Sequence, residues 1–431
     1  MLQSYYLSKN TAVTEGSSYL RSSSQTERDC HFTVADLFAG AGGLSLGFKR
    51  AGFDVLAAYD NWAPAVETYR LNLGSHIHLA DITASLDIPW TTVIVGGPPC
   101  QGFSSAGMRR GDDQRNSLVS EFSKLVARTK PLAFVFENVE GFLTTANGKC
   151  VFELLDPLIE AGYRLHLRKI NAANYGVPQH RKRVVAIGGL GWDPCFPVPS
   201  HAAFGAPGAH LANGAAAIPT PTFGNALAQL PALSASVPAA DPDHVRNELS
   251  DSELERARLL KPGESMRDLP EELWHNSYKR RAFRRVMDGT PTERRGGPPH
   301  GLRRLRVDEP SKAITGASLR DFIHPLEDRH LTLRECATLQ TFPLNFRFAG
   351  TSSEKIQLVG NAVPPILAEK IAKSLYDDLC TLKVSYSTGA LLSFIPTSSS
   401  GMSPVLQQMS RLVSERYPPA EEPQYVGYLW P

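Results

Sequence analysis

Closely spaced cysteine pairs are missing from this sequence. The chain has 431 residues, and its six cysteines lie far apart with no C-x-x-C motif, at Cys30, Cys100, Cys150, Cys195, Cys336 and Cys380. Structural zinc sites and disulfide-stabilised domains use cysteines at short, regular spacings. The sequence therefore predicts no metal site and no disulfide framework. It fits a reducing compartment, and we expect a bacterial cytoplasm.

Long hydrophobic runs are also missing. Residues 1–31 are polar and contain no apolar stretch of the length found in a signal peptide. No other stretch is long and apolar enough to span a bilayer. We expect residues 1–31 to be a lead-in without regular structure and the protein to have no membrane partner.

The chain has almost no net charge, with a formal value of +2, but its basic residues are unevenly distributed. Residues 277–306 contain ten Lys or Arg against Asp288 and Glu293, a local excess of about eight positive charges. Such a run fits a polyanion. A solvated basic surface is the alternative interpretation.

Short β-branched runs alternate with helical periodicity from residue 32 to about residue 190. The runs at 33–38, 54–59, 93–95, 132–136, 164–170 and 183–188 are typical of strands, and 44–51, 64–73, 117–129 and 151–161 of helices. This alternation predicts an α/β fold with a mostly parallel, doubly wound sheet and helices on both faces. In such a fold, ligands bind at the carboxyl ends of the strands.

The alternation stops near residue 190 and regular periodicity returns after residue 310. Thr332 and Glu335 predict a capping box at the start of a helix. Val363, Leu367, Ile371 and Leu375 predict a second amphipathic helix. We expect 32–190 and 310–380 to form one domain, 191–309 to form an inserted small domain, and 381–431 to be a tail whose role the sequence does not indicate.

The first loop, DLFAGAGGLSLGF at 36–48, joins a strand to a helix through several glycines. Glycines permit a sharp turn and close approach of a ligand, and the helix N-terminus offers N–H groups to an anion. Asp60 and Asp81 end the next two strands, where acids suit a ribose and an adenine amine. S-adenosylmethionine fits this arrangement, but a dinucleotide, or glycines needed only for the turn, fit the loop almost as well.

The second segment, VIVGGPPCQGFSSAG at 93–107, places Cys100 after a buried strand. Two prolines make the backbone beside the sulfur rigid, while the following glycines permit the loop to move. A lone cysteine is usually an inert small hydrophobic residue. Its place at a strand end facing the ligand crevice indicates a nucleophile instead.

The third segment, FVFENVEGF at 134–142, ends an apolar strand in Glu137. Burial can raise the pKa of such a glutamate until it acts as an acid near neutrality. Pairing with an arginine is the structural alternative. Arg181 and Arg183 alternate toward one face of a later strand, where either could bind a base carbonyl or be an ordinary edge charge.

In this order, these segments resemble the motif series of the DNA cytosine-5 methyltransferases. The resemblance rests on DLFAGAGGLS (36–45), PPCQGFS (98–104), ENV (137–139), the Q-x-R-x-R run (179–183), RHLTLRECATLQTFP (329–343) and LVGNAVPP (358–365). Two further segments, 219–231 and 309–315, resemble parts that frame the family's target-recognition region. One departure is Asp60, where the family commonly has glutamate.

The resemblance implies the fold, the reaction and the site residues. The fold would be the Rossmann-like doubly wound sheet of S-adenosylmethionine-dependent methyltransferases, with 191–309 as the target-recognition domain. Cys100 would attack C6 of a cytosine rotated out of duplex DNA, Glu137 would contact N3 and the amine, and Arg183 with Arg181 would hold O2. The implied cofactor contacts are Phe38, Gly40, Gly42, Gly43, Leu44, Asp60, Asp81, Ile82, Pro98, Leu118, Asn361 and Val363. Asn138 would brace Pro98–Pro99, and Glu335 would stabilise the structure.

The expected DNA contacts come from the nucleophile loop and the basic run. They are Gln101, Ser104, Arg280, Arg281, Arg284, Arg285, Arg294, Arg295, Arg303 and Arg304, and Arg306 is a further candidate for reading guanine edges. We expect a monomer that acts beside a cognate restriction endonuclease. The helix after Asn361 has to return to the first loop for such a site to form.

Three alternatives remain open from the sequence. A tRNA-modifying enzyme of the same family usually carries a Cys-Phe-Thr segment, which this sequence lacks. A catalytically silent DNA-binding regulator typically loses the nucleophile or the glutamate, and both are present here. An NAD oxidoreductase is disfavoured by Ser45, which stands where a dinucleotide loop has its third glycine.

Overall fold

The computed structural model describes residues 30–99, 117–202, 218–233, 241–246, 248–279, 301–381, 383–386, 389–397, 402–418 and 424–428. The chain divides into two compact units, Met1–Cys30 and His31–Pro431. Everything below concerns the second unit. Within the described residues, no helix is long and apolar enough to cross a membrane.

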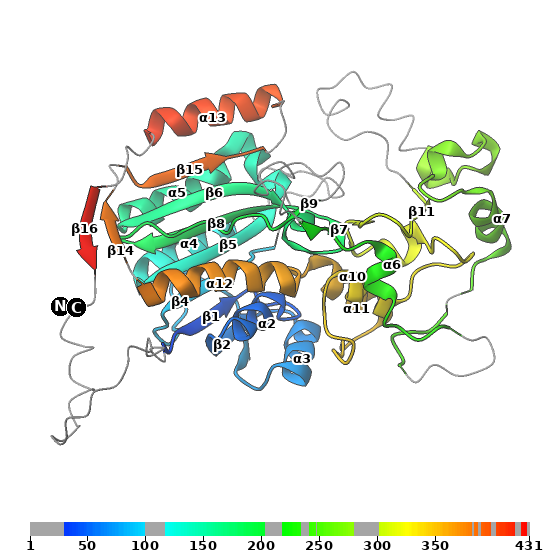
Figure 1. Cartoon of the computed structure of the whole chain (residues 1–431), viewed down its shortest axis with the longest axis horizontal. Helices are drawn as coiled ribbons and strands as arrows, with labels where there is room; N and C mark the ends of the chain where they lie inside the picture. Colours follow the sequence, from blue (N-terminus) through cyan, green and yellow to red (C-terminus); the bar gives the residue numbers. More distant parts are fainter. Residues whose placement is uncertain are drawn as a thin grey trace, which may run out of the picture. The chain divides into compact units, whose positions relative to one another are not determined.

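An eight-stranded sheet organises this unit (Figure 1). In spatial order its strands are β15 (Leu391–Ile395), β6 (Tyr163–Asn171), β8 (Lys182–Leu190), β5 (Ala133–Val139), β4 (Val93–Gly96), β1 (Thr33–Leu37), β2 (Asp54–Asp60) and β3 (Ile77–Leu79). Only β8 runs antiparallel to its neighbours, and the other pairs are parallel. The sheet is therefore mostly parallel, as the sequence predicts.

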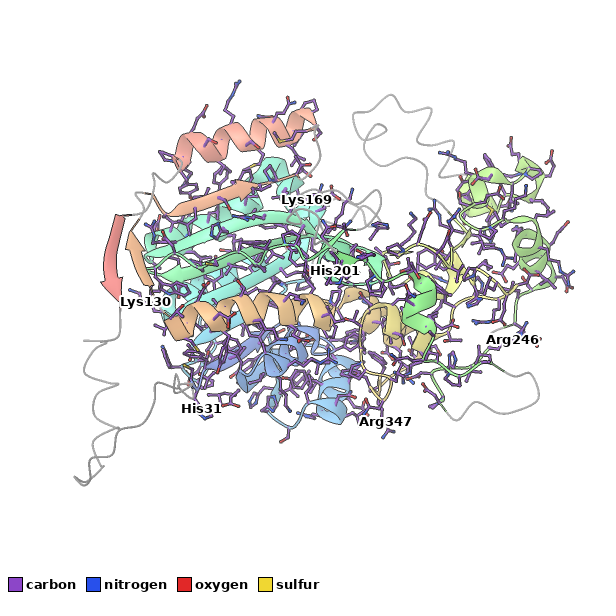
Figure 2. All side chains as sticks on the ribbon, viewed as in Figure 1. His31, Lys130, Lys169, His201, Arg246 and Arg347 are labelled. Atoms are coloured by element: carbon purple, nitrogen blue, oxygen red, sulfur yellow. The ribbon has the colours of Figure 1, made fainter. Side chains whose placement is uncertain are left out.

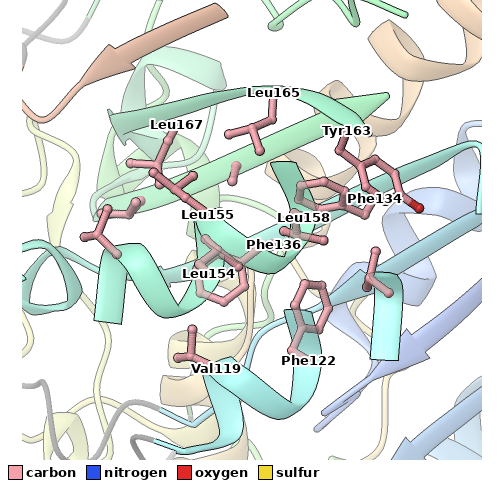
Figure 3. Packing of buried hydrophobic residues seen from close by; sticks show 14 of the residues in the cluster. Val119, Phe122, Phe134, Phe136, Leu154, Leu155, Leu158, Tyr163, Leu165 and Leu167 are labelled. Atoms are coloured by element: carbon pink, nitrogen blue, oxygen red, sulfur yellow. The ribbon is translucent and has the colours of Figure 1, made fainter. Parts of the chain in front are cut away.

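Apolar residues on both faces of the central strands bury the sheet between helices. In β5, Phe134 and Phe136 belong to one buried cluster, while Ala133 and Val135 belong to the other. The first cluster is covered by α4 (Ser117–Thr129), α5 (Lys149–Glu160) and α13 (Pro404–Arg416). Figure 3 shows Phe122 of α4 and Leu154 of α5 packed beside Phe134 and Phe136.

The opposite face is covered by α2 (Gly43–Arg50) and α12 (Pro365–Thr381). Figure 1 shows α12 and α13 on opposite sides of the sheet. The two helices α2 and α12 approach closely because α2 carries glycines on the contact side. A Cβ on Gly43 would lie 2.1 Å from the carbonyl oxygen of Val363, and one on Gly47 would lie 2.4 Å from Cβ of Ala368.

α3 (Ala63–Asn72) packs beside β2 and β3 through a small cluster that includes Val66, Tyr69 and Ile77. Two helices of the returning segment, α10 (Leu333–Leu339) and α11 (Ser352–Asn361), bury a third cluster with α6 (Phe223–Leu227). Short strand pairs join the segments around them: β7 (Gln179–His180) with β12 (Ser311–Lys312), β9 (His201–Ala202) with β10 (Ile218–Pro219), and β11 (Arg303–Arg304) with β13 (Phe322–Ile323).

Residues around α7 (Asp251–Leu259) have a small core of their own. It contains Ala257, Met266, Tyr278, Leu302 and Ile323. The remaining elements of this region are the 3-10 turns η7 (Met266–Asp268) and η8 (Glu271–Leu273) and the short helix α9 (Ser318–Asp321). A separate apolar cluster agrees with an inserted domain, whose bounds at 191–309 remain a prediction.

The sequence predictions for the sheet are confirmed with ends shifted by a few residues, but two elements differ. Part of the tail, for which the sequence predicts no element, forms the edge strand β15 and pairs with β6. Its five residues lie in a segment too short and isolated to show a periodicity. The helix predicted to contain Val363 begins only at Pro365, because Pro364 and Pro365 lack the N–H that a helix interior needs. A hairpin of β14 (Lys383–Tyr386) and β16 (Gln424–Tyr428) completes the described strands.

Candidate active site

One edge of the sheet gathers the predicted site residues. The carboxyl ends of β1, β2, β4 and β5 lie there because these strands are parallel, and the antiparallel β8 begins there. Asp60 ends β2, Glu137 lies near the end of β5, and Arg183 is the second residue of β8. In the β5–β8 register, Arg183 is opposite Val139 and Val185 is opposite Glu137. The sheet topology therefore brings together residues that are far apart in the sequence.

Glu137 and Arg183 form an ion pair at this edge. Nε of Arg183 lies 2.7 Å from Oε1 of Glu137, and both side chains are almost buried. Burial raises the pKa of the Glu137 carboxyl, although the charges of Arg183 and Arg181 act in the opposite direction. A buried carboxyl of this kind is suited to hold a proton and to contact a polar ligand.

The end of β4 leaves space for Glu137. A Cβ on Gly97 would lie 3.2 Å from Oε2 of Glu137, so a larger residue there would press on the carboxylate. Asn138 donates from Nδ2 to the carbonyl oxygen of Pro98 across 3.4 Å. The predicted bracing of the Pro98–Pro99 turn by Asn138 is thereby confirmed. Cys100, which follows this turn, lies outside the described residues, as do Gln101 and Ser104.

Arg181 has a different environment from Arg183. It is 1% exposed, and its guanidinium donates to the carbonyl oxygens of Ile314, Gly360 and Ala362. Gln179 also binds the returning segment: its side chain donates to Gln340 and accepts from the N–H of Ile314. Arg181 therefore fastens the returning segment to the sheet, and we do not retain it as a contact to the base. The arginine that faces Glu137 is Arg183.

The first loop has the backbone that its glycines predict. Phe38, Gly40 and Gly42 all have positive φ angles, of 61°, 56° and 85°. A Cβ on Gly40 would meet no atom within 4 Å, whereas one on Gly42 would lie 2.3 Å from the Leu73 side chain. Gly40 thus borders open space and Gly42 borders α3. This is the form of a loop that lets a ligand approach its backbone.

A buried carboxylate stabilises the first turn of α2. Oδ2 of Asp36 accepts hydrogen bonds from the backbone N–H and the hydroxyl of Ser45, at 3.1 and 2.6 Å. Gly42, the residue at the N-cap, has no side chain for this purpose, so Asp36 satisfies one of the free N–H groups of the first turn. Burial raises the pKa of Asp36 to about 7. Tyr69 donates to the Ser45 hydroxyl and contacts His76, which extends the network to α3 and β3.

The two acids predicted to bind the cofactor differ in their surroundings. Asp60 accepts from the N–H groups of Gly40 and Trp62, at 2.8 and 2.9 Å, so it holds the loop as well as facing the site. Burial raises the pKa of the Asp60 carboxyl. Asp81 is exposed and accepts from Nδ2 of Asn61. Both carboxylates retain lone pairs for a polyhydroxylated ligand.

Apolar residues lie on the α4 side of this edge. Ile82 is buried in the cluster under α4, and Phe38 packs against that cluster. The N–H of Ala84 donates to Glu121, which holds the loop after Asp81 against α4. Leu118, in the first turn of α4, is partly exposed. These side chains can form the apolar wall of a pocket beside Asp60 and Asp81.

The returning chain reaches the first loop, as the sequence requires. The carbonyl of Val363 faces Gly43, and Leu44 belongs to the same buried cluster as Val363. Asn361, the last residue of α11, is exposed near this contact. Glu335 has the structural role expected of it: it caps α10 with Thr332 and accepts from the buried Arg329.

Of the basic run at 277–306, the structure describes residues 277–279 and 301–306. Arg280, Arg281, Arg284, Arg285, Arg294 and Arg295 lie outside the described residues. Arg303 is partly buried and lines a concavity of about 880 Å³ beside α7, β11 and β13. Arg304 is 6% exposed and donates to the backbone carbonyl oxygens of Ala257, Leu260, His324 and Glu327. Arg306 pairs with Asp308 and Glu309.

The contact predicted for Arg304 is therefore withdrawn, because its donors are committed within the protein. Arg306 is less available for the same reason. The run RRLR at 303–306 does not reveal which arginine side chains point inward when the strand is only two residues long. Arg303 remains the candidate at this end of the run.

The site suits a small cofactor with a polar sugar and an anionic end. Four features together form the donor and acceptor set that S-adenosylmethionine needs: open space beside Gly40, Asp60 at the end of β2, Asp81 and the first turn of α2. Asp81 was predicted to end a strand, but β3 ends at Leu79 and Asp81 lies in the loop that follows. Among the described residues, no group of three or more His, Cys, Asp or Glu could hold a metal ion.

Three residues of the site were not singled out by the sequence. Asp36 lies inside the strand TVADL, where an acid between apolar neighbours is a signal of a buried hydrogen-bonding role. Gln179 belongs to the Q-x-R-x-R run, but no role was assigned to it. In the sequence, Ser45 stands out only as a missing glycine. In the structure, its hydroxyl donates to the buried Asp36.

The chain is similar to known proteins in sequence and in fold. The sequence profile of the C-5 cytosine-specific DNA methylases matches residues 32–377. The Type II methyltransferase M1.HphI of Haemophilus parahaemolyticus is 36% identical over 356 residues, which cover 80% of this chain and 86% of that protein. The Type II methyltransferase M.AgeI of Thalassovita gelatinovora is 31% identical, with 79% of this chain and 98% of that protein covered.

A solved structure has the same fold. It is a DNA modification methyltransferase encoded within an E. coli prophage, with a TM-score of 0.59 and 27% sequence identity. The similarity covers 81% of this chain and 99% of that chain.

Proposed function

Because the chain belongs to the C-5 cytosine-specific DNA methylases, we propose that it methylates C5 of one cytosine within a specific duplex DNA sequence, through a covalent adduct between Cys100 and C6. The enzyme is a DNA cytosine-5 methyltransferase, which removes the oxidoreductase alternative. The methyl donor we propose is S-adenosylmethionine.

The observation that carries the proposal is the pair of Glu137 and Arg183. The two side chains converge at the carboxyl edge of the sheet and are nearly buried. Arg183 offers further N–H donors, and burial raises the pKa of Glu137 against the opposing charge of Arg183, so that this carboxyl is suited to take up a proton when it meets the base. Together they match the ring N3 and the O2 carbonyl of a cytosine, which accept hydrogen bonds.

Cys100 begins the reaction in this proposal. Its thiolate adds to C6, and the electron pair of the C5–C6 double bond moves toward C5 as the S–C6 bond forms. The proton that Glu137 holds at N3 and the charge of Arg183 at O2 stabilise the negative charge that develops in the ring. Once C5 carries the methyl group, a base removes the C5 proton, the double bond re-forms and the thiolate leaves.

Residues of the first loop and of the return segment would hold the cofactor. When bound, S-adenosylmethionine supplies an electrophilic methyl group attached to a sulfonium. Asp60 and Asp81 would bind the ribose hydroxyls and the adenine amine, and the first turn of α2 at Gly43 and Leu44 would face the carboxylate. Phe38, Ile82 and Leu118 would provide the apolar wall, with Asn361 and Pro98 at its rim.

The target sequence would be read by the region between 191 and 309. Its basic run would neutralise phosphates, and the concavity lined by Arg303 faces the same region. The two relatives described above are Type II methyltransferases. We propose by extension that this protein is a monomer that protects host DNA from a cognate restriction endonuclease.

A duplex that carries 5-fluorocytosine at the target position tests the adduct. Fluorine cannot leave C5 as a proton does, so the reaction stops with Cys100 still bonded to C6. Incubation with S-adenosylmethionine is expected to give a protein–DNA complex that survives denaturing electrophoresis, and Cys100→Ser is expected to give none. A trapped complex from Cys100→Ser, or none from the wild type on a duplex that it methylates, would contradict the proposed adduct.

A further inference from the structure

The segment just before Arg183, from β7 to the first residue of β8, presents two sets of side chains. Gln179 and Arg181 are fully buried and bind the returning segment. Side chains alternate along a strand, so His180, the second residue of β7, points away from Gln179. Lys182 is the first residue of β8. His180 is half-buried and Lys182 is exposed. Neither His180 nor Lys182 has a part in the proposed reaction.

A residue from the returning segment joins this outer side. In the β7–β12 pair, Lys312 is directly opposite His180, and Ser311 is opposite Gln179. Paired residues of adjacent strands point to the same face. Ser311 is buried together with Gln179, whereas Lys312 is exposed and His180 is half-buried. His180 and Lys312 therefore lie on one face. Lys182, two residues beyond His180, is close enough for its charge to act on the imidazole, and we call the three residues the outer basic face.

The outer basic face has uncompensated positive charge. Within the described residues, neither Lys182 nor Lys312 has a carboxylate within ion-pair distance. Burial and then the charge of Lys312 lower the pKa of His180, Glu309 opposes this, and Lys182 lowers it further. Glu309 itself lies 3.0 Å from Nε of Arg306, which balances its charge.

We propose that Lys182, Lys312 and His180 bind a backbone phosphate beside the target cytosine, on the strand whose base enters the site. The inference rests on the proposed DNA substrate and extends it to a site outside the basic run. Two ammonium groups bind a phosphate by charge, and a neutral imidazole adds a hydrogen bond.

The position of this face supports the assignment. Lys182 is the chain neighbour of Arg183, whose guanidinium faces Glu137. A base held by Glu137 and Arg183 brings its own flanking phosphates close to the start of β8. Lys312 also lines the concavity that contains Arg303 and Arg320. The outer basic face thus connects the site of the base to the region proposed to read the sequence.

The first experiment measures DNA binding as a function of salt for Lys182→Gln, Lys312→Gln and the double variant. Each phosphate that the protein neutralises contributes about 0.9 to the slope of log K against log salt concentration. Because both lysines are proposed to bind the same phosphate, we expect the double variant to lose close to one such contribution on specific and non-specific duplexes alike. Binding of S-adenosylmethionine is expected to stay unchanged, because the lysines lie outside the cofactor site.

Lys130→Gln is the matched control. Lys130 is exposed and precedes β5, so it lies at the opposite edge of the sheet from Lys182 (Figure 2). Lys130→Gln changes the net charge by the same amount as Lys182→Gln or Lys312→Gln alone, and it leaves the outer basic face intact. The salt slope of Lys130→Gln is expected to equal that of the wild type.

A second experiment locates the phosphate. Duplexes carry a neutral methylphosphonate at one of the two phosphates that flank the target cytosine, one duplex for each position. One of them is expected to weaken binding by the wild type and by Lys130→Gln, yet to weaken binding by the double lysine variant little or not at all.

Each result leads to a definite conclusion. If the wild type methylates DNA while the double variant keeps its salt slope, or responds to both methylphosphonates as the wild type does, the outer basic face is not a phosphate site and the proposed function stands. If the wild type neither binds nor methylates DNA, the proposed function and this inference fail together.

Discussion

Nε of Arg183 and Oε1 of Glu137 lie 2.7 Å apart at the carboxyl edge of the sheet. Neither residue predicts the other in the sequence, because 45 positions separate them and only the antiparallel pairing of β5 with β8 brings them together. The pair connects the acid proposed to hold N3 with the guanidinium proposed to hold O2. In the proposed mechanism the two groups act on one ring.

Replacement of Arg183 by glutamine is expected to lower the rate of methyl transfer roughly a hundredfold or more, as loss of one preorganised donor to a developing negative charge does. Arg183→Lys keeps the charge but loses the planar pair of donors, and it is expected to recover only part of the rate. Single-turnover kinetics on a saturating duplex measure both. Calorimetric binding of S-adenosylmethionine serves as the control and is expected to be unchanged. A wild-type rate in Arg183→Gln would remove Arg183 from the reaction.

Replacement of Arg181, unlike that of Arg183, is expected to lower the stability of the protein. Its guanidinium donates to three backbone carbonyls of the returning segment inside the protein. Arg181→Met leaves these carbonyls without donors, and the free energy of unfolding is expected to fall by about 3 kcal/mol. Urea unfolding followed by circular dichroism measures the change, with Arg183→Gln as the comparison. Equal stability of Arg181→Met and the wild type would contradict the fastening role.

Asp36 predicts a dependence of stability on pH. Its pKa is about 7 in the folded protein because of burial, whereas in the unfolded chain it has the ordinary value near 4. Between these values the unfolded chain releases a proton that the folded protein keeps, so the free energy of unfolding falls as the pH rises from about 4 to about 7. The contribution is at most about 4 kcal/mol.

The measurement compares the wild type with Asp36→Asn, which cannot ionise. Urea unfolding at a series of pH values is expected to show the difference between the two proteins shrinking or reversing toward pH 7 and staying level above it. A difference that does not change with pH would show that Asp36 is ionised throughout this range or does not differ between the folded and unfolded states.

Gly43 tests whether the returning chain completes the cofactor loop. A Cβ at this position would lie 2.1 Å from the carbonyl oxygen of Val363, which is backbone and cannot rotate away. Gly43→Ala is therefore expected to weaken S-adenosylmethionine binding and to lower the free energy of unfolding by about 1–3 kcal/mol. Gly316→Ala is the control, because a Cβ there meets nothing closer than 3.8 Å. Unchanged cofactor affinity in Gly43→Ala would separate this contact from the binding site.

The sequence predicts the central sheet well because its strands and helices carry strong periodic patterns. Phe134, Phe136 and their neighbours in β5 form an uninterrupted apolar run, which fits a strand covered on both faces. Asp60 and Glu137 follow from the same pattern, since each lies at or near the end of a strand.

The sequence does not predict contacts that depend on long-range packing. Arg181, Arg183 and Arg304 look equivalent in the sequence, yet Arg181 and Arg304 have their donors committed to backbone carbonyls and Arg183 faces Glu137. The edge strand β15 is equally hard to foresee, because this short strand, with one buried and four half-buried residues, pairs with a strand more than 200 positions earlier. Pairing of this kind depends on the finished sheet.

Bisulfite sequencing tests the central claim most directly. DNA is taken from a methylation-free host that expresses the wild type, and in parallel from the same host expressing Cys100→Ser. The account predicts protected cytosines at one position of a single recurring short sequence in the wild-type sample, and none in the Cys100→Ser sample. Fully converted cytosines from a host that contains folded wild-type protein, or equal protection in both samples, would contradict it.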